Sequence, residues 1–231
     1  MAAADSLARV RREIEACERC PRLRAWCREV ARSKVRRFAD QPYWGKPVPG
    51  FGDPRARVLI VGLAPAAHGG NRTGRVFTGD RSGDFLFAAL HRAGFANQPT
   101  SVSRDDGLVL RDCYVAAAAR CAPPANKPTP DEMAHCRGYL QREWRLLSEL
   151  RAVLVLGKIA LDALLAALRE TGRVERRALA FGHGVSHDLG GGLRLFCSYH
   201  PSQQNTFTGK LTSADLDRVL ADMKGHLRRT R

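Results

Sequence analysis

The chain has 231 residues, of which 44% are hydrophobic, so one α/β domain with a full core is favoured over two small domains. Lysine and arginine number 38 against 23 aspartates and glutamates, a net charge of +15. This surplus favours a polyanionic partner, because basic groups that neutralise phosphates release condensed counterions, although solvated surface arginines explain it equally well. The sequence lacks a signal-peptide core and an apolar run of membrane-spanning length, so we expect a cytoplasmic protein without membrane contact.

The N-terminal part of the chain is basic and helical in pattern. Residues 5–37 predict one or two helices that break near Pro21. The following segment, residues 40–54, is rich in proline and glycine and predicts an ordered loop.

Four apolar segments have the pattern of strands that are buried on both faces of a parallel sheet. They are residues 57–63, 112–119, 152–157 and 194–200. Helical patterns follow each of them, so we expect a mainly parallel four-stranded sheet covered by helices on both faces, within a single domain over residues 1–231.

The helices that follow these strands carry recognisable start signals. Ser82 is a plausible N-cap for the first helix, and Thr129 with Glu132 makes a possible capping box for the second. The third helix follows Gly157, and the last begins near Thr212.

Three polar loops follow strands, at residues 64–82, 120–130 and 200–211. In parallel sheets, ligands bind beyond the carboxyl ends of the strands, where such loops lie. We therefore expect the three loops to converge on one site.

Seven cysteines are present, an odd number that does not favour structural disulfides in a chain that looks intracellular. Cys17 and Cys20 form a Cys-x-x-Cys pair, and Cys121 and Cys136 flank the second loop. Together they predict a four-thiolate site that joins the N-terminal helical segment to the sheet edge. Their spacing does not choose between structural zinc and an iron–sulfur cluster. The other cysteines are expected to be free thiols: Cys27, Cys113 and Cys197.

The first loop, GLAPAAHGGNRTGRVFTGD over residues 62–80, is the most distinctive stretch of the chain. It has neither the ending of a Walker A loop nor the glycine spacing of a dinucleotide loop. Its glycines allow a ligand to approach the backbone closely. On general grounds a core aromatic explains Phe77, and a helix cap explains Asp80, slightly better than a ligand-binding role does.

This loop and the segment HPSQQN at residues 200–205 resemble the two active-site motifs of the family 5 uracil-DNA glycosylases. The four cysteines match the cluster pattern of that family, and the resemblance covers about residues 15–225. It implies the α/β/α sandwich of the glycosylase superfamily and a [4Fe–4S] cluster rather than zinc. It also implies removal of uracil and other deaminated or damaged bases from double-stranded DNA, by a protein that we expect to be a monomer.

Base excision breaks the bond between the base and C1′ of the sugar, after the base has been flipped out of the stack. The transition state carries positive charge on the sugar and negative charge on the base. With the resemblance, Asp80 is expected to activate water and stabilise the sugar, and His200 to donate a hydrogen bond to the departing base. Asn126 is expected to contact the base edge or position water, although a simple turn role explains it nearly as well.

The resemblance also assigns residues to the base pocket, with Phe77 stacking on the flipped base. The expected pocket residues are Gly62, Ala64, Phe77, Ala117 and Ser202. Ala117 stands where family 4 enzymes carry an asparagine that reads uracil, so this pocket should discriminate less strictly between bases.

Loop residues on the same face are expected to hold the DNA. They are Arg72, Lys127, Gln203, Asn205 and Lys210. Phe207 is a possible apolar wedge for the gap left by the flipped base. For each of these, a solvated loop side chain is the plain alternative.

Two other classes of protein explain part of the sequence. A non-catalytic DNA-binding protein with a structural metal or iron–sulfur site accounts for the charge and the cysteines, but not for Asp80, Phe77 and His200. An electron-transfer protein accounts for the cysteines alone. A glycosylase assay separates these possibilities.

Overall fold

A computed structural model describes residues 4–172 and 179–230, so both ends of the expected domain and residues 173–178 lie outside the described residues. A six-stranded mixed sheet has the order β1-β3-β2-β4-β6-β5. Its strands are β1 (Phe51–Gly52), β2 (Val58–Gly62), β3 (Cys113–Ala117), β4 (Ala152–Leu156), β5 (Ser186–Gly190) and β6 (Leu193–Ser198).

The four predicted strands are confirmed, and they pair in parallel. The expected total of four strands is wrong, because β1 and β5 add one antiparallel strand at each edge. Neither edge strand shows the apolar pattern of a buried strand. The first is two residues long inside the proline- and glycine-rich loop, and the second is the largely polar sequence SHDLG.

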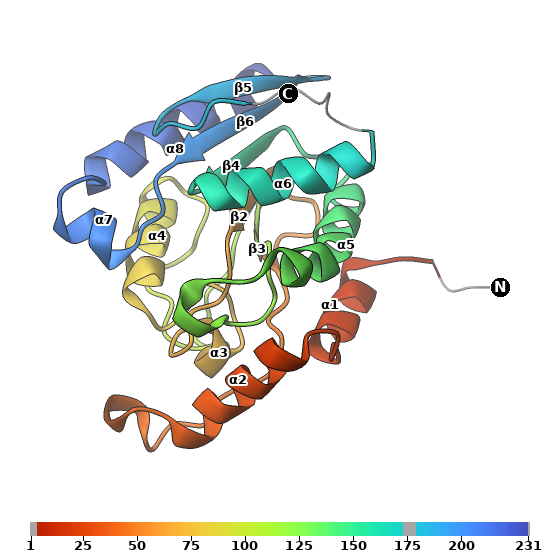
Figure 1. Ribbon diagram of the computed structural model, residues 1–231. Helices are drawn as coiled ribbons and strands as arrows, with labels where there is room; N and C mark the ends of the chain where they lie inside the picture. The colour runs from red at the N-terminus through yellow and green to blue at the C-terminus, as the bar shows by residue number, and fades with distance from the viewer. Residues whose placement is uncertain (1–3, 173–178, 231) are drawn as a thin grey trace.

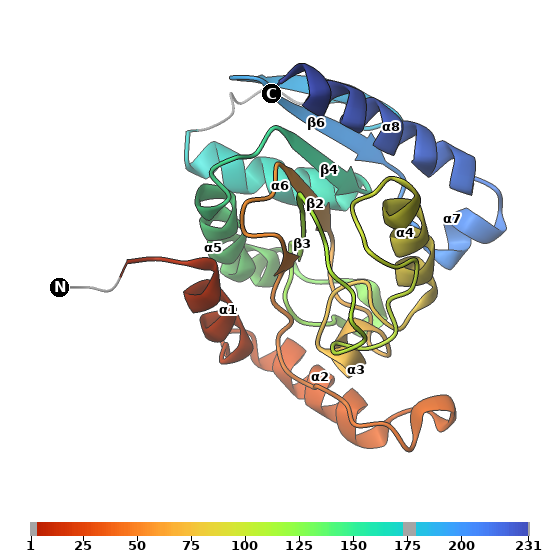
Figure 2. The same ribbon diagram turned by 180° about the vertical axis from the view of Figure 1, so that it is seen from behind.

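Helices cover both faces of the sheet, as the α/β/α expectation required (Figures 1 and 2). The helices α5 and α6 lie on one face, and α4 and α8 lie on the other. The described helices are α1 (Leu7–Glu15), α2 (Pro21–Ser33), η1 (Arg36–Phe38), α3 (Gly70–Thr73), α4 (Arg81–Arg92), η2 (Pro124–Asn126), α5 (Pro130–Leu146), α6 (Lys158–Glu170), α7 (Gln203–Phe207) and α8 (Ser213–Arg229).

Most of the predicted helix starts are confirmed. Pro21 begins α2, and Thr129 and Glu132 form the reciprocal capping box of α5. Thr212 caps α8. The prediction that Ser82 caps the helix after the first loop is wrong, because Asp80 does so two residues earlier.

Two apolar cores result from the alternation of side chains along the central strands. Ile60 and Leu154 face α4 and α8, whereas Leu59 and Val153 face α5 and α6. All four are fully buried, which is why these strands read as continuous apolar runs.

The N-terminal helices lie beside the sandwich. Val10 and Ile14 of α1 pack against Tyr139 of α5, and α2 lies next to α3. Across the part of the chain that the structure describes, no helix combines the length and apolarity that a bilayer crossing requires.

Candidate active site and cysteine cluster

The three polar loops converge on one pocket of about 420 Å³, which confirms the expected meeting of the loops. His68 and Asp80 enter it from the loop after β2, Asn126 from the loop after β3, and Gln203 from the segment after β6. Because β2, β3 and β6 run in the same direction, the loops at their carboxyl ends share one edge of the sheet.

Asp80 caps α4 and also lines the pocket. One carboxylate oxygen, Oδ1, accepts the Gly83 N–H at 2.9 Å and caps α4. The other oxygen lies so close to Gly69 that a Cβ atom there would approach it to 1.9 Å. The glycine therefore leaves room for the carboxylate at the pocket wall. Burial raises the pKa of Asp80, as expected for an acid withdrawn from water.

His200 lies two residues beyond the end of β6, on a tightly held turn. Its carbonyl oxygen accepts the Ser202 N–H and the Asn205 Nδ2–H, each at 2.8 Å. Gly157, with φ +99°, lies alongside, and a Cβ atom at that position would be 3.5 Å from the His200 Cβ. Burial lowers the pKa of His200 to about 4, so the imidazole is neutral near pH 7 and carries a single N–H donor.

Phe77 lies between Gly62 and His200. A Cβ atom on Gly62 would approach the Phe77 ring to 2.7 Å, and the Phe77 and His200 rings have centroids 5.8 Å apart. Phe77 has φ +51°, a left-handed conformation that is uncommon for an aromatic residue. Ala117 pairs with Gly62 across the neighbouring strand and is buried. Ala64 lies two residues beyond β2 and is half-buried.

The contact between Gly62 and Phe77 gives a direct test of the ring's position. Gly62→Ala should displace Phe77, lower the free energy of unfolding by about 1–3 kcal/mol and slow base excision. Gly138→Ala in α5 is the matched control, because no atom lies within 4 Å of a Cβ there. Denaturant unfolding and single-turnover excision measure the two effects. Normal excision by Gly62→Ala would show that the ring is not needed where it lies.

The second loop presents Asn126 and Lys127 to solvent at the end of the one-turn helix η2. Asn126 has φ +56° and follows Ala125 at φ +50°. This turn places Asn126 at the wall of the pocket. A turn role and a pocket role are therefore compatible for Asn126.

The segment after His200 forms the short helix α7. Ser202 caps it through the Asn205 N–H, and Asn205 holds the His200 carbonyl, so both support the histidine turn. Gln203 is exposed at the pocket mouth. Phe207 is 75% exposed at the end of α7, and Lys210 lies with its Nζ 4.7 Å from the Tyr199 ring centroid.

The Arg72 side chain lies inside the protein and not on the predicted DNA-binding surface. Its side chain is buried and donates to the carbonyls of His68 and Gly79 at 2.8 and 2.7 Å, and to Gln41 Oε1 at 2.5 Å. The guanidinium also lies over the Phe38 ring, 3.8 Å from its centroid. Arg72 thus holds the first loop together and is not free to bind a DNA phosphate.

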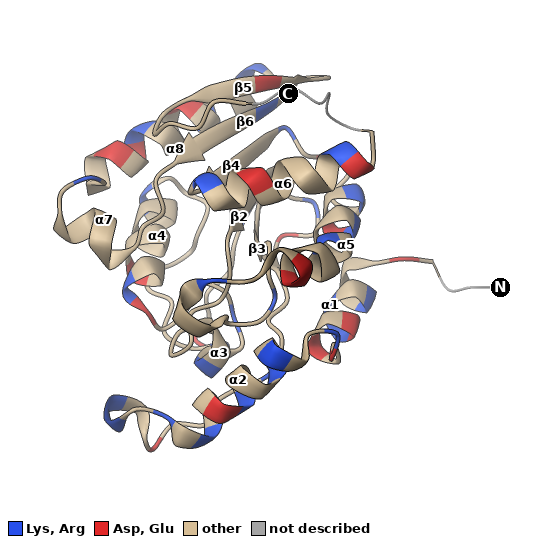
Figure 3. Cartoon of the chain, viewed as in Figure 1, with Lys and Arg blue, Asp and Glu red and all other residues tan. Residues whose placement is uncertain are grey.

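The pocket also contains residues that the sequence did not single out. Arg37 and Phe38 line it from the segment between α2 and β1, about thirty residues before the first loop. Tyr43 bonds to His68 Nδ1 through its hydroxyl at 3.0 Å. Only the run of arginines before Phe38 signalled a binding role here, and no local pattern connected it to this pocket. Figure 3 shows this basic segment as the short turn beyond the end of α2.

The four cysteines of the predicted cluster lie in the connection between α1 and α2, in the loop after β3 and in α5. Cys20, Cys121 and Cys136 are buried, Cys17 is partly exposed, and all four are free thiols. Burial and the neighbouring thiols of Cys136 and Cys17 raise the pKa of Cys20 to about 11. Cys27, which we expected to stand apart, hydrogen-bonds to Cys121 and donates to the Ala122 carbonyl at 3.4 Å.

The surroundings of these cysteines combine burial with nearby arginines. Within residues 4–172 and 179–230, no three His, Cys, Asp or Glu side chains are placed to hold one metal ion. Burial raises the pKa of Cys20 and of Cys136, and the hydrogen bond with Cys27 together with burial raises the pKa of Cys121. The positive charges of Arg19, Arg24 and Arg120 nearby oppose these shifts only in part.

The fold and these loops define a class of protein: an α/β/α sandwich with a half-buried carboxylate, a neutral histidine and an aromatic ring on the loops beyond the carboxyl ends of its parallel strands. A family model described as "Uracil DNA glycosylase superfamily" matches residues 49–224. The chain belongs to that superfamily, and within it to the type-5 uracil-DNA glycosylases.

The relatives support the type as well as the superfamily. The chain is 54% identical over 222 residues to the type-5 uracil-DNA glycosylase of Mycobacterium tuberculosis, covering 96% of this chain and 82% of the relative. It is 51% identical over 211 residues to that of Thermus thermophilus, covering 91% and 94%. Similarity to the type-4 enzyme of Pyrobaculum aerophilum is lower, at 31% over 157 residues, 67% of this chain and 71% of the relative.

Proposed function

We propose that this protein hydrolyses the N-glycosidic bond of uracil and other deaminated bases in double-stranded DNA, acting as a monomer in the cytoplasm. The observation that carries the proposal is that the half-buried Asp80 carboxylate lines the pocket where the loops meet, while the neutral, half-buried His200 lies next to the Phe77 ring at the end of β6. Such a pair can stabilise opposite charges on the sugar and on the base.

In the proposed reaction, a water oxygen bonds to C1′ while the bond from C1′ to the base nitrogen breaks. The electron pair of that bond leaves with the base. Asp80 takes the proton from the water and faces the positive sugar with its negative charge. Its Oδ1 is already engaged by the Gly83 N–H, so Oδ2 is the oxygen assigned to this step.

His200 acts on the leaving base. With a pKa of about 4 the imidazole is neutral, so it donates a hydrogen bond to the developing anion and does not transfer a full proton as an imidazolium would. Phe77 offers its ring to the flipped base, and Asn126 orients either the base edge or the water.

We assign a [4Fe–4S] cluster to Cys17, Cys20, Cys121 and Cys136, as the type-5 assignment suggests. When bound, the cluster would cross-link the connection between α1 and α2, the loop after β3 and α5, and it would take no part in the chemistry at C1′. The fit rests on three buried free thiols and one partly exposed one, with arginines around them.

Cys17→Ser should lower the iron content and the yield of folded protein, because one ligand of the cluster is lost. Cys27→Ser is the matched control, since Cys27 touches Cys121 but is not assigned as a ligand. Iron analysis and the visible absorption spectrum measure the outcome. If Cys27→Ser loses iron and Cys17→Ser keeps it, the ligand set is misassigned.

For DNA binding we retain Lys127, Gln203 and Lys210, which are exposed around the pocket, and we propose Phe207 as the wedge. Asn205 and Arg72 are engaged within the protein and support the site instead.

Lys127→Ala should weaken DNA binding and flatten its salt dependence by about one unit of slope, because one phosphate contact is lost. Arg55→Ala, an exposed site before β2 at the opposite edge of the sheet, is the control and should keep the slope of the unaltered protein. DNA affinity is measured at several salt concentrations for both variants. If the two variants show the same dependence of affinity on salt, Lys127 does not contact a phosphate.

The experiment that tests the function itself is single-turnover excision from a duplex that contains one uracil, with release of free uracil as the readout. The expected result is uracil release together with an intact strand that carries an abasic site. Absence of release by protein that retains iron and binds DNA would favour the non-catalytic alternative.

A further inference from the structure

The active-site pocket continues into a longer groove. A hollow of about 290 Å³ adjoins it and shares Arg37, Phe38 and Asp80 with it. A third hollow, of about 720 Å³, adjoins the second and shares Gln41, Arg72 and Val102 with it. We call the three together the flank groove; it runs from Asn126 to Trp44.

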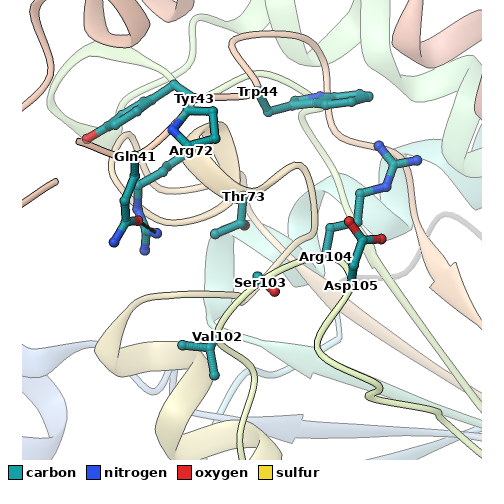
Figure 4. A pocket seen from close by; sticks show the side chains of 10 residues that line it. Gln41, Tyr43, Trp44, Arg72, Thr73, Val102, Ser103, Arg104 and Asp105 are labelled. Atoms are coloured by element: carbon teal, nitrogen blue, oxygen red, sulfur yellow. Dashed lines mark hydrogen bonds between the residues drawn. The ribbon is translucent and has the colours of Figure 1, made fainter. Parts of the chain in front are cut away.

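The far end of the flank groove is built from two segments distant in sequence. Figure 4 shows Tyr43 and Trp44 along one side, Val102 and Ser103 across from them, and Arg104 with Asp105 at one end. The two segments precede β1 and β3, respectively, and Arg72 and Thr73 of the first loop lie between them.

Aromatic rings and a guanidinium group line this end of the flank groove. The Arg104 guanidinium lies 4.6 Å from the Trp44 ring centroid, and a Cβ atom on Gly74 would approach the same ring to 2.9 Å. The indole therefore rests on the backbone at Gly74 and supports Arg104. The Arg104 guanidinium also pairs with Glu15 Oε1 at 3.4 Å, and its side chain remains 29% exposed. A guanidinium supported on an aromatic ring in this way can stack on a nucleobase.

The groove is also tied rigidly to the base pocket. The Tyr43 hydroxyl bonds to His68, which lines the pocket, and Arg72 beneath joins Gln41 to the Gly79 carbonyl.

Val102, at the opposite lip, is 61% exposed although it is apolar. A surface of aromatic rings, cations and an exposed apolar lip is the composition of a single-strand binding track.

We propose that the flank groove binds unpaired nucleotides of the lesion-bearing strand, those that continue from the flipped nucleotide, with Arg104 and Tyr43 as its contact residues. This inference rests on the proposed function, since the strand enters the groove from the base pocket. A paired flank does not fit the role, because its bases are stacked within the duplex and offer no free face to Arg104. Arg37 and Arg104 supply positive charge at the two ends of the groove, although Asp84 and Asp105 also line it and Glu15 pairs with Arg104.

The test compares two DNA probes that carry a stable tetrahydrofuran abasic-site analogue, one fully paired and one with the flank of the lesion unpaired. The unaltered protein should bind the second probe more tightly, by about fivefold or more, as one stacked base typically contributes. Arg104→Ala and Val102→Glu should abolish this difference, and Arg55→Ala should retain it. Val102 and Arg55 are exposed, so at least these two variants should fold.

Equal binding of both probes by the unaltered protein, or an unchanged preference in Val102→Glu and Arg104→Ala, overturns the inference. If the groove binds a protein partner instead, the unaltered protein should also bind the two DNA probes equally tightly. Uracil release from a fully paired duplex is measured in parallel. If no uracil is released, the proposed function is wrong. If uracil is released but the protein shows no preference for the probe with the unpaired flank, only the proposal for the flank groove is wrong.

Discussion

Replacing Asp80 with asparagine should slow single-turnover excision of uracil and of hypoxanthine by comparable factors, about 10²–10⁴. The factors should match because Asp80 acts on the water and the sugar, which are the same for every base. Asparagine is as good an N-cap as aspartate, so α4 should stay capped and the thermal midpoint should not fall. The substitution thus separates the chemical role of the carboxylate from its structural one.

The pH profile provides an independent check on the same residue. Burial raises the pKa of Asp80 above its ordinary value of 3.8, so the carboxyl becomes protonated at a higher pH than an exposed aspartate does. Excision should therefore fall as the pH is lowered through that raised pKa, and Asp80→Asn should lose this acid limb. A near-normal rate in Asp80→Asn would leave the aspartate as a helix cap only, and Asn126 would become the leading candidate for positioning the water.

Replacing His200 with alanine should slow excision of uracil by about 10²–10³, the typical cost of one donor to a developing anion. The loss should differ for hypoxanthine, because the hydrogen bond needs an acceptor in the right place on the departing base. The contrast between the two bases is the diagnostic feature, since Asp80→Asn should show none.

A matched control for His200 is Asn205→Ala, which removes a donor to the His200 carbonyl but leaves the imidazole in place. It should lower the rate less than His200→Ala and by similar factors for both bases, because it loosens the turn only. Equal losses on uracil and hypoxanthine in His200→Ala would show that the histidine does not act on the base.

Much of the site could be predicted because its residues lie in two contiguous motifs. Asp80, Phe77 and Gly62 belong to one segment of nineteen residues, and His200 opens the other. The predicted parallel strands explain why loops so far apart in sequence meet, since their carboxyl ends share an edge. That Asp80 rather than Ser82 caps α4 could not be read locally, because both are good N-cap residues near the same helix start.

The sequence by itself determined the central parallel strands, the helix starts at Pro21, Thr129 and Thr212, and the meeting of the loops at one pocket, because apolar period and capping chemistry are local. Tertiary structure decided the rest, because it depends on contacts between distant segments. The polar edge strand β5 forms only because it pairs with β6, and Arg72 is withdrawn from solvent only because Gln41 and Phe38 come to lie against it. For the same reason the flank groove, built where Trp44 meets Arg104 sixty residues later, has no counterpart in the linear pattern.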